Sequence, residues 1–284
     1  MSEEEKECLA TLFRFALNIK RSDMPPTIWK YIKLFMPILE KKELVVSHAS
    51  HKIKYHVPYL IFKYDDEDVD VLIEKLPTYE NKLKENENFP KFIKYMEKYL
   101  STPKYILKDT INITVNNVPK KLYEICANKP FVAYKNDGTR SIIPKGQSGG
   151  YIESEQNLSQ EGSCWIGFGN NVCDNALITG NAYVGGGSSK IRGNVIIKDN
   201  AICHNSFIQD NVIIANNSVI KTSCIKDNVE IFGNSIVKDS DIFGNVWIEN
   251  ALIENKQLKD NEKIKGQEVN CSDRYWKKVC NFND

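Results

Sequence analysis

A hydrophobic pattern repeats along the C-terminal half of the chain with a period of 17 residues. Valines share one column of this repeat, and isoleucines share a second column two residues later. The columns are Val195, Val212, Val229 and Val246, and Ile197, Ile214, Ile231 and Ile248. Successive side chains of a strand point to opposite faces, so each repeat opens with a short strand whose first and third residues point inward. Such a repeat predicts a solenoid, in which each unit buries its apolar residues against the next.

Two further triplets follow in each repeat, usually with a small residue first and a larger apolar residue third. They lie at Ala201/Cys203, Ser218/Ile220 and Ser235/Val237, and at Ser206/Ile208, Ser223/Ile225 and Ser240/Ile242. Three short strands within 17 residues require three changes of direction, which predicts a triangular coil. Stacked coils of this kind form parallel sheets on three faces, with rungs about 4.8 Å apart.

Asparagine recurs at the expected corners of the coil. Asn194, Asn211, Asn228 and Asn245 precede the first strand of their coils, and Asn200, Asn217 and Asn234 precede the second. Asparagine tolerates the left-handed backbone conformation, and stacked asparagine side chains can hydrogen-bond along a column. We therefore expect these positions to form tight corners and side-chain ladders. A two-residue excess at 185–189 predicts a small protruding loop.

The chain outside the repeat has different patterns. Apolar residues at helical spacing predict helices at 4–20, 27–42, 66–76 and 89–101. Alternating residues at 111–115, 122–126 and 141–143 predict short strands. Beyond the repeat, Ser272 is placed to cap a short helix whose Tyr275 and Trp276 would cover the last rung.

These patterns together predict an α+β multidomain chain. A helical N-terminal domain (1–105) and a β-rich connector (106–163) precede a three-sided parallel β-helix with 17-residue coils (164–265). A C-terminal helical cap (266–284) completes the chain.

Composition and charge exclude several classes of protein. Hydrophobic residues make up 42% and charged residues 26%, which is typical of globular chains. No apolar run approaches the roughly 20 residues of a membrane span, and the acidic opening residues do not form a secretory signal, so a cytoplasmic protein is expected. A net charge of +1 gives no field that favours nucleic acid. The eight cysteines are scattered without a Cys-x-x-Cys pair, which indicates reduced thiols.

Residues 149–166, GGYIESEQNLSQEGSCWI, and the Gly-Asn-Ala and Asp-Asn-Ala sequences that follow resemble a group of bacterial and phage hexapeptide-repeat proteins. This group, of the YdcK type, carries a transferase label and belongs to the left-handed β-helix superfamily. The resemblance covers about residues 120–260. It implies a left-handed parallel β-helix, an oligomer and, if catalysis is retained, acyl transfer from acyl-CoA. A homotrimer would fit the superfamily, and a dimer is the alternative.

His204 is the only histidine of the coil and lies at a corner in the sequence Cys203-His-Asn-Ser206. The resemblance implies that a corner histidine acts as general base toward an acceptor hydroxyl or amine. The alternative is a solvated corner residue, because Lys221 and Lys238 share its column and supply no carboxylate to orient the imidazole.

Three other segments carry residue types that bind ions, and each has a structural explanation. The carboxylates of 64–70 fit no EF-hand spacing and suit a helix N-terminus. His48 and His51 would share a helix face, but no third ligand is in view. Residues 185–189 are rich in glycine but lack the lysine of a P-loop. We therefore predict no metal and, unless acyl-CoA is used, no cofactor.

Outward positions of the coil are unusually apolar for a solvated surface. The residues concerned are Ile196, Ile213, Ile236, Trp247 and Leu252. Solenoid faces of this kind are natural contact surfaces. The sequence thus favours a non-catalytic scaffold that binds a protein partner or self-associates, and the bacterial and phage setting of the resemblance adds a partner-binding inhibitor as one form of this role. The second hypothesis is an acyl-CoA-dependent acyltransferase that uses His204.

Overall fold

The structure is a computed structural model that describes residues 8, 26, 30, 89–134 and 140–266. The chain divides into two compact units, Met1–Pro103 with Lys129–Val132, and Lys104–Asn128 with Ala133–Asp284. The helices expected before residue 89 and the expected cap lie outside the described residues, apart from residues 8, 26, 30 and 266. Those expectations therefore stay predictions.

Helix α5 (Phe89–Ser101) is the helix expected at 89–101. Its buried side chains are Phe89, Phe92 and Met96, which recur at intervals of three and four residues as an amphipathic helix requires. The hydroxyl of Thr102 donates to the carbonyl of Lys98 at 2.7 Å and closes the last turn. Among the described residues, no helix combines the length and the apolar character that crossing a membrane requires.

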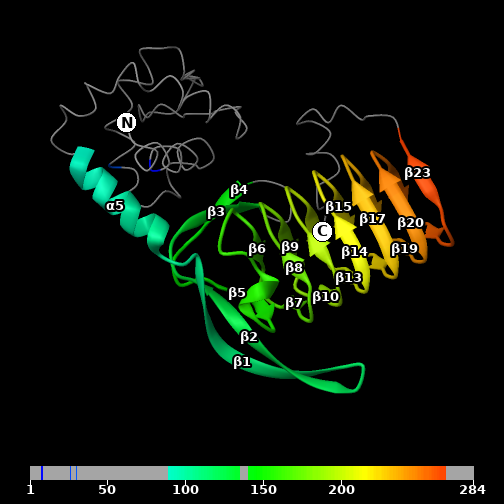
Figure 1. Ribbon diagram of the computed structural model, residues 1–284, viewed down its shortest axis with the longest axis horizontal. Helices are drawn as coiled ribbons and strands as arrows, with labels where there is room; N and C mark the ends of the chain where they lie inside the picture. Colours follow the sequence, from blue (N-terminus) through cyan, green and yellow to red (C-terminus); the bar gives the residue numbers. More distant parts are fainter. Residues whose placement is uncertain (1–7, 9–25, 27–29, 31–88, 135–139, 267–284) are drawn as a thin grey trace, which may run out of the picture. The chain divides into compact units, whose positions relative to one another are not determined.

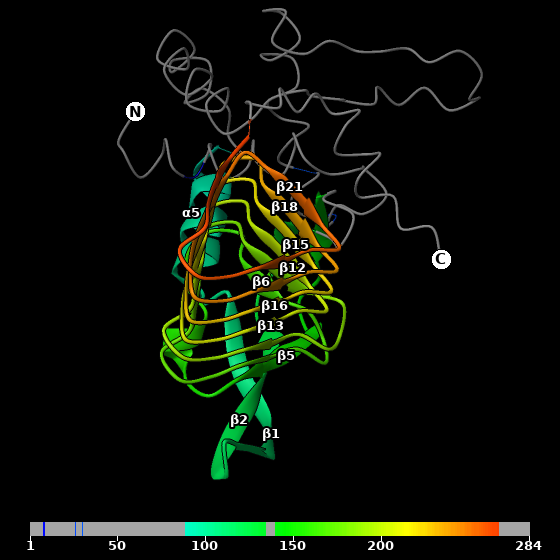
Figure 2. The ribbon, with the colours of Figure 1, turned by 90° about the vertical axis from the view of Figure 1, so that its right-hand side faces the viewer.

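A long hairpin opens the second unit and projects from the coil (Figures 1 and 2). It consists of β1 (Tyr105–Val115) and β2 (Val118–Ala127), paired antiparallel with Val115 opposite Val118. The two turn residues, Asn116 and Asn117, both have positive φ, at 50° and 65°. This is the Asn-rich two-residue turn that matches the twist of paired strands. The sequence analysis located parts of both strands but missed this turn.

Short elements connect the hairpin to the coil. They are β3 (Phe131–Tyr134), β4 (Arg140–Ile143), β5 (Ser148–Ile152) and the 3₁₀ helix η3 (Glu155–Asn157). Strand β5 pairs antiparallel with β2 on one side and parallel with β7 on the other. Parallel stacking therefore begins at Tyr151, earlier than the repeat indicates, because the first turn contains η3 and does not follow the 17-residue pattern.

The coil supplies strands to three sheets, and within the coil these strands pair parallel (Figure 1). The nine-stranded sheet runs from β1, β2 and β5 through β7 (Asn171–Val172), β10 (Lys190–Ile191), β13 (Phe207–Ile208), β16 (Cys224–Ile225), β19 (Asp241–Ile242) and β22 (Gln257–Leu258). The β8–β23 sheet contains β8 (Leu177–Ile178), β11 (Ile196–Ile197), β14 (Asn211–Ile214), β17 (Asn228–Phe232), β20 (Asn245–Glu249) and β23 (Lys263–Lys265). The β6–β21 sheet contains β6 (Trp165–Ile166), β9 (Tyr183–Gly185), β12 (Ile202–His204), β15 (Val219–Lys221), β18 (Ile236–Lys238) and β21 (Leu252–Glu254).

The interior of the coil confirms the expected inward columns. Val195, Ile197, Val212 and Ile214 are completely buried, and the last three each pair in register with the residue 17 positions on. Small inward residues fit the narrow interior, and where they are serines their hydroxyls bridge adjacent coils. For example, Ser223 Oγ donates to the carbonyl of Lys221 and accepts from the amide of Ser240. The hydroxyls of Ser189, Ser206 and Ser240 likewise accept an amide of the next coil, and together with Ser223 they form one serine ladder.

The corners correct one detail of the sequence analysis. The residues with left-handed backbone lie one position before the asparagine columns, at Asp210 (φ 68°) and Asp227 (φ 70°) for example. Asn211 and Asn228 follow them and form the expected ladder instead, with Asn211 Nδ2 donating to Asn228 Oδ1 at 2.9 Å. Aspartate suits the corner because it tolerates the left-handed region and its carboxylate accepts the amide of the next coil's corner.

The inward isoleucines make the coil stable, and we expect Ile231→Ala to show this. The side chain is completely buried, so its truncation should lower the free energy of unfolding by about 2–5 kcal/mol. Chemical denaturation would measure the change. The control is Glu230→Ala, at the exposed preceding position, which should change stability by less than about 0.5 kcal/mol. Equal losses for both variants would contradict the inward assignment.

Candidate functional site

The five apolar residues expected on the outside of the coil fall on two different sheets. Ile196, Ile213 and Trp247 belong to the β8–β23 sheet, on β11, β14 and β20. Ile236 and Leu252 belong to the β6–β21 sheet. The 17-residue spacing already places Ile196, Ile213 and Trp247 in one column, but the sequence analysis grouped all five residues together, so we treat the two sheets separately.

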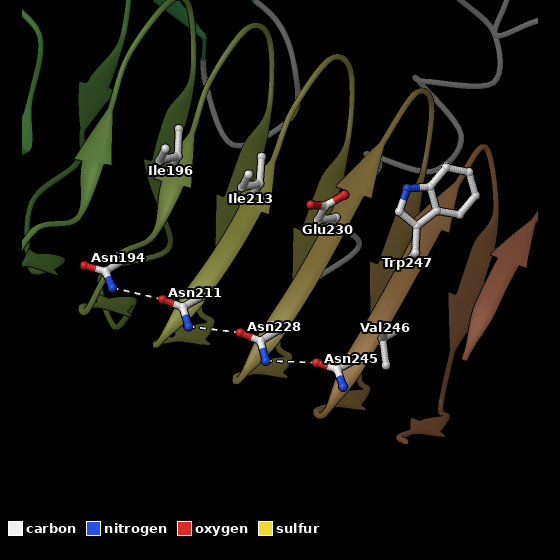
Figure 3. A pocket seen from close by; sticks show the side chains of 9 residues that line it. All are labelled: Asn194, Ile196, Asn211, Ile213, Asn228, Glu230, Asn245, Val246 and Trp247. Carbon is white, nitrogen blue, oxygen red and sulfur yellow. Dashed lines mark hydrogen bonds between the residues drawn. The ribbon is translucent and has the colours of Figure 1, made fainter. Parts of the chain in front are cut away.

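A shallow groove of about 440 Å³ lies on the outer face of the β8–β23 sheet (Figure 3). Parallel register places Ile196, Ile213, Glu230 and Trp247 in one column, a rung apart. Ile196, Ile213 and Trp247 are half-buried, whereas Glu230 is exposed. The column ends at Lys263, whose ammonium lies 4.6 Å from the centre of the Trp247 ring. The groove thus combines an apolar floor with one acidic and one basic group.

An asparagine ladder forms one edge of the groove. Asn194, Asn211, Asn228 and Asn245 donate in turn to the next asparagine, each Nδ2 to Oδ1 distance being 2.9 Å (Figure 3). The last of these bonds, from Asn245, reaches Asn261. Because each amide is held by its neighbours, this edge is a rigid polar rim beside the apolar floor.

The β6–β21 sheet does not offer the exposed apolar surface that the sequence suggested at Ile236. Ile236 is only 5% exposed, because it packs in a cluster with Ile202, Val219 and the half-buried Tyr183. Leu252, in the next rung, is 56% exposed. Ile236 therefore packs in a cluster on the outer side of the β6–β21 sheet, and we exclude it from the candidate binding surface.

His204 ends strand β12 and is half-buried. Its neighbours in the column are Gly185 and Lys221. Burial lowers the pKa of His204, and the charge of the Lys221 ammonium lowers it further. The imidazole is consequently neutral at neutral pH, as a proton acceptor must be. Its position agrees with the corner expected from the sequence, but nothing in this geometry identifies a substrate.

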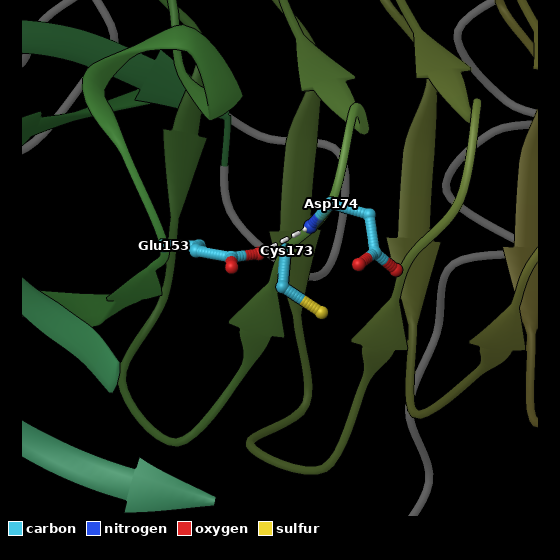
Figure 4. A group of neighbouring side chains, drawn as sticks. All are labelled: Glu153, Cys173 and Asp174. Carbon is cyan, nitrogen blue, oxygen red and sulfur yellow. Dashed lines mark hydrogen bonds between the residues drawn. The ribbon is translucent and has the colours of Figure 1, made fainter. Parts of the chain in front are cut away.

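A second cluster joins the hairpin to the first coil. Glu153, Cys173 and Asp174 place ligand atoms within 4.8 Å of one another (Figure 4). The Lys120 ammonium lies 2.8 Å from Glu153 Oε2 and 2.6 Å from Asp174 Oδ1. Burial, together with Asp174, raises the pKa of the Cys173 thiol to about 11, so the thiol is protonated at neutral pH. Lys120 places one positive charge between the two carboxylates, and we interpret this cluster as a structural ion pair.

Sequence analysis missed the cluster because its members are not periodic. Lys120 lies on β2, Glu153 follows β5, and Asp174 is a left-handed corner residue with φ 58°. Only the antiparallel packing of the hairpin on β5 brings them together.

No protein-family model matches the chain, and no curated protein shows significant similarity to it. The parallel β-helix is therefore established by the structure, while the resemblance to hexapeptide-repeat proteins has no independent support.

The ion pair should make stability depend on pH. Burial alone would raise the pKa of Asp174, but hydrogen bonds from Lys120 and the amide of Gly193 outweigh burial and lower the pKa below its usual 3.8. The stabilisation is thus complete above the usual pKa and is lost as the pH falls through the lowered pKa. Asp174→Asn should lower the free energy of unfolding by about 1 kcal/mol at pH 7, and by progressively less as the pH falls below 3.8.

Denaturation curves at several pH values would measure this difference. The matched control is Asp199→Asn, at another left-handed corner whose carboxylate accepts the amide of Asn216. A difference between wild type and Asp174→Asn that stays constant from pH 7 to pH 2 would contradict the ion pair.

Proposed function

We propose that this protein is a non-catalytic binding scaffold that uses the outer face of the β8–β23 sheet to contact protein. The groove along Ile196, Ile213 and Trp247 carries this proposal. The partner surface is either a second copy of the chain or another protein, since both would cover an apolar column with a polar rim. A partner-binding inhibitor is one form of this role.

The physical basis is the combination of a rigid surface and a large aromatic side chain. Tryptophan is enriched among residues that dominate binding energy, particularly where surrounding groups exclude water. The groove side chains stand on hydrogen-bonded strands, so little conformational entropy is lost on binding. Trp247 is held further by the Lys263 ammonium over its ring. The face is thus organised before a partner arrives.

The charged groups of the column would set the orientation of a bound partner. Glu230 and Lys263 lie one rung to either side of Trp247. A partner with a basic and an acidic group on either side of an apolar patch would match this order. Charges at the edge of an interface contribute more to orientation and association rate than to affinity.

The finer expectations belong to the same proposal. A left-handed coil and an oligomer are what the resemblance implies, and a homotrimer would fit the superfamily. A cytoplasmic location agrees with the free thiols of Cys126, Cys164, Cys173 and Cys203, since reduced cysteines are typical of that compartment.

Trp247→Asp tests the proposed face. If wild-type protein self-associates, this change should raise the dissociation constant at least about 30-fold, because it places a charge in the apolar column. Native mass spectrometry across a concentration series would measure it. Leu252→Asp is the matched control, at an exposed apolar position on the other sheet. An oligomer weakened by Leu252→Asp and unchanged by Trp247→Asp would refute this choice of face.

Acyl transfer is the second candidate, favoured by the neutral, half-buried imidazole of His204. It predicts that His204→Ala abolishes transfer from acetyl-CoA to added amine acceptors and leaves the melting temperature nearly unchanged. Thiol release from acetyl-CoA would measure the activity. Thiol release that is absent from the wild type, or that persists in His204→Ala, would exclude this role for His204.

A further inference from the structure

A buried lysine contacts a buried cysteine at the beginning of the second unit. Lys104 is 2% exposed, and Cys164 is completely buried. The Lys104 Nζ atom donates to Cys164 Sγ at 3.1 Å. It also donates to the carbonyls of Glu161 at 3.0 Å and Gly162 at 3.4 Å. These carbonyls aim the amine at the sulfur and hold the two atoms together although 60 residues separate them in the chain.

The surrounding contacts make this position rigid. Gln160 Oε1 accepts from the amide of Lys104 at 2.8 Å, and Gln160 Nε2 donates to the carbonyl of Tyr105 at 3.2 Å. The Tyr105 hydroxyl donates to the carbonyl of Leu158 at 2.6 Å. The start of β1 and the loop before β6 are therefore fixed against each other at the point where the pair lies.

From this geometry we infer that Lys104 and Cys164 form an oxidative modification site, in which peroxide converts the pair into a sulfur–nitrogen cross-link. This inference does not depend on the proposed function. In the first step the Cys164 sulfur attacks one oxygen of hydrogen peroxide, the O–O bond breaks, and Cys–SOH and water form. The sulfur loses two electrons, which reduce the peroxide.

In the second step the Lys104 nitrogen attacks the sulfur of Cys–SOH. The S–O bond breaks as the S–N bond forms, and the departing hydroxide takes a proton from the nitrogen to give a second water. The net reaction consumes one thiol, one amine and one peroxide and yields the S–N bond and two waters. Sulfenic acids condense in this way with backbone nitrogen to give sulfenamides.

The environment supports the amine as the nucleophile. Burial lowers the pKa of Lys104, although the nearby Cys164 opposes this shift in part. A lysine with a lowered pKa presents a larger fraction of the neutral amine, which has the lone pair that the second step requires. Because Cys164 is buried, larger thiols cannot reach its sulfenic acid in the folded protein. The Lys104 amine, 3.1 Å from the sulfur, is therefore well placed to attack it.

The experiment treats the full-length protein with hydrogen peroxide and follows it by intact mass and peptide mapping. We expect a loss of about 2 Da, the two hydrogens removed by S–N bond formation. The peptides that contain Lys104 and Cys164 should be joined, and a thiol reductant should separate them. The cross-linked protein should melt several degrees higher, because the link closes a long loop in the unfolded chain.

Cys203 is the internal control for oxidant access, since it is also completely buried. Lys104→Gln should abolish the joined peptide and leave Cys164 as a sulfenic acid, which dimedone captures once the protein is unfolded. If that variant does not fold, peptide mapping of the peroxide-treated wild type tests the inference by itself. Oxidation of Cys164 to sulfinic or sulfonic acid without the joined peptide would overturn the inference. So would a Cys164 that stays reduced while Cys203 is oxidised, or a protein in which neither cysteine reacts.

Discussion

The structure depends on one constraint, the hydrogen bonding of each coil to the next at a nearly constant offset. Phe207 donates to the carbonyl of Ser223, and Cys224 donates to that of Ser240, in each case from one coil to the next. The strands of the coil have only two to five residues, as in β11 and β17. No such coil buries enough surface alone, so each coil owes its stability to its neighbours. A change of offset would therefore break every column at once.

This constraint converts columns of sequence into columns of contacts. Inside the coil it stacks serine hydroxyls so that each accepts an amide from the next rung. At the corner it stacks asparagine amides into a ladder. Outside the coil it aligns Ile196, Ile213 and Trp247 beside that ladder. The candidate binding face is thus a consequence of the same register that holds the fold together, and its rigidity comes from the same bonds.

The periodic part of the chain was largely predictable, whereas the described residues outside it were predictable only in part, as at α5 and in parts of β1 and β2. The 17-residue repeat predicts the inward residues because alternation and repeat length are properties of the sequence itself. The residues with left-handed backbone lie one position before the asparagines that the sequence analysis assigned to the corners. Gly193 and Asp210 occupy these positions, and both residue types occur in loops as well as in tight corners. The hairpin turn at Asn116 and Asn117 was also missed, because residues 118–121 directly after it show no alternation of hydrophobic and polar residues.

The sequence by itself determined the repeat, the three faces of the coil and the identity of the outward apolar residues. Only the tertiary structure decided which of these residues are covered and which stay open to a partner. Ile236 and Trp247 look equivalent along the chain, yet one packs in a cluster and the other lines a groove. Likewise, Lys120 meets Asp174 and Lys104 meets Cys164 only in the folded chain. The physical reason is that local periodicity sets the direction of a side chain, whereas its partners depend on segments that arrive from elsewhere in the chain.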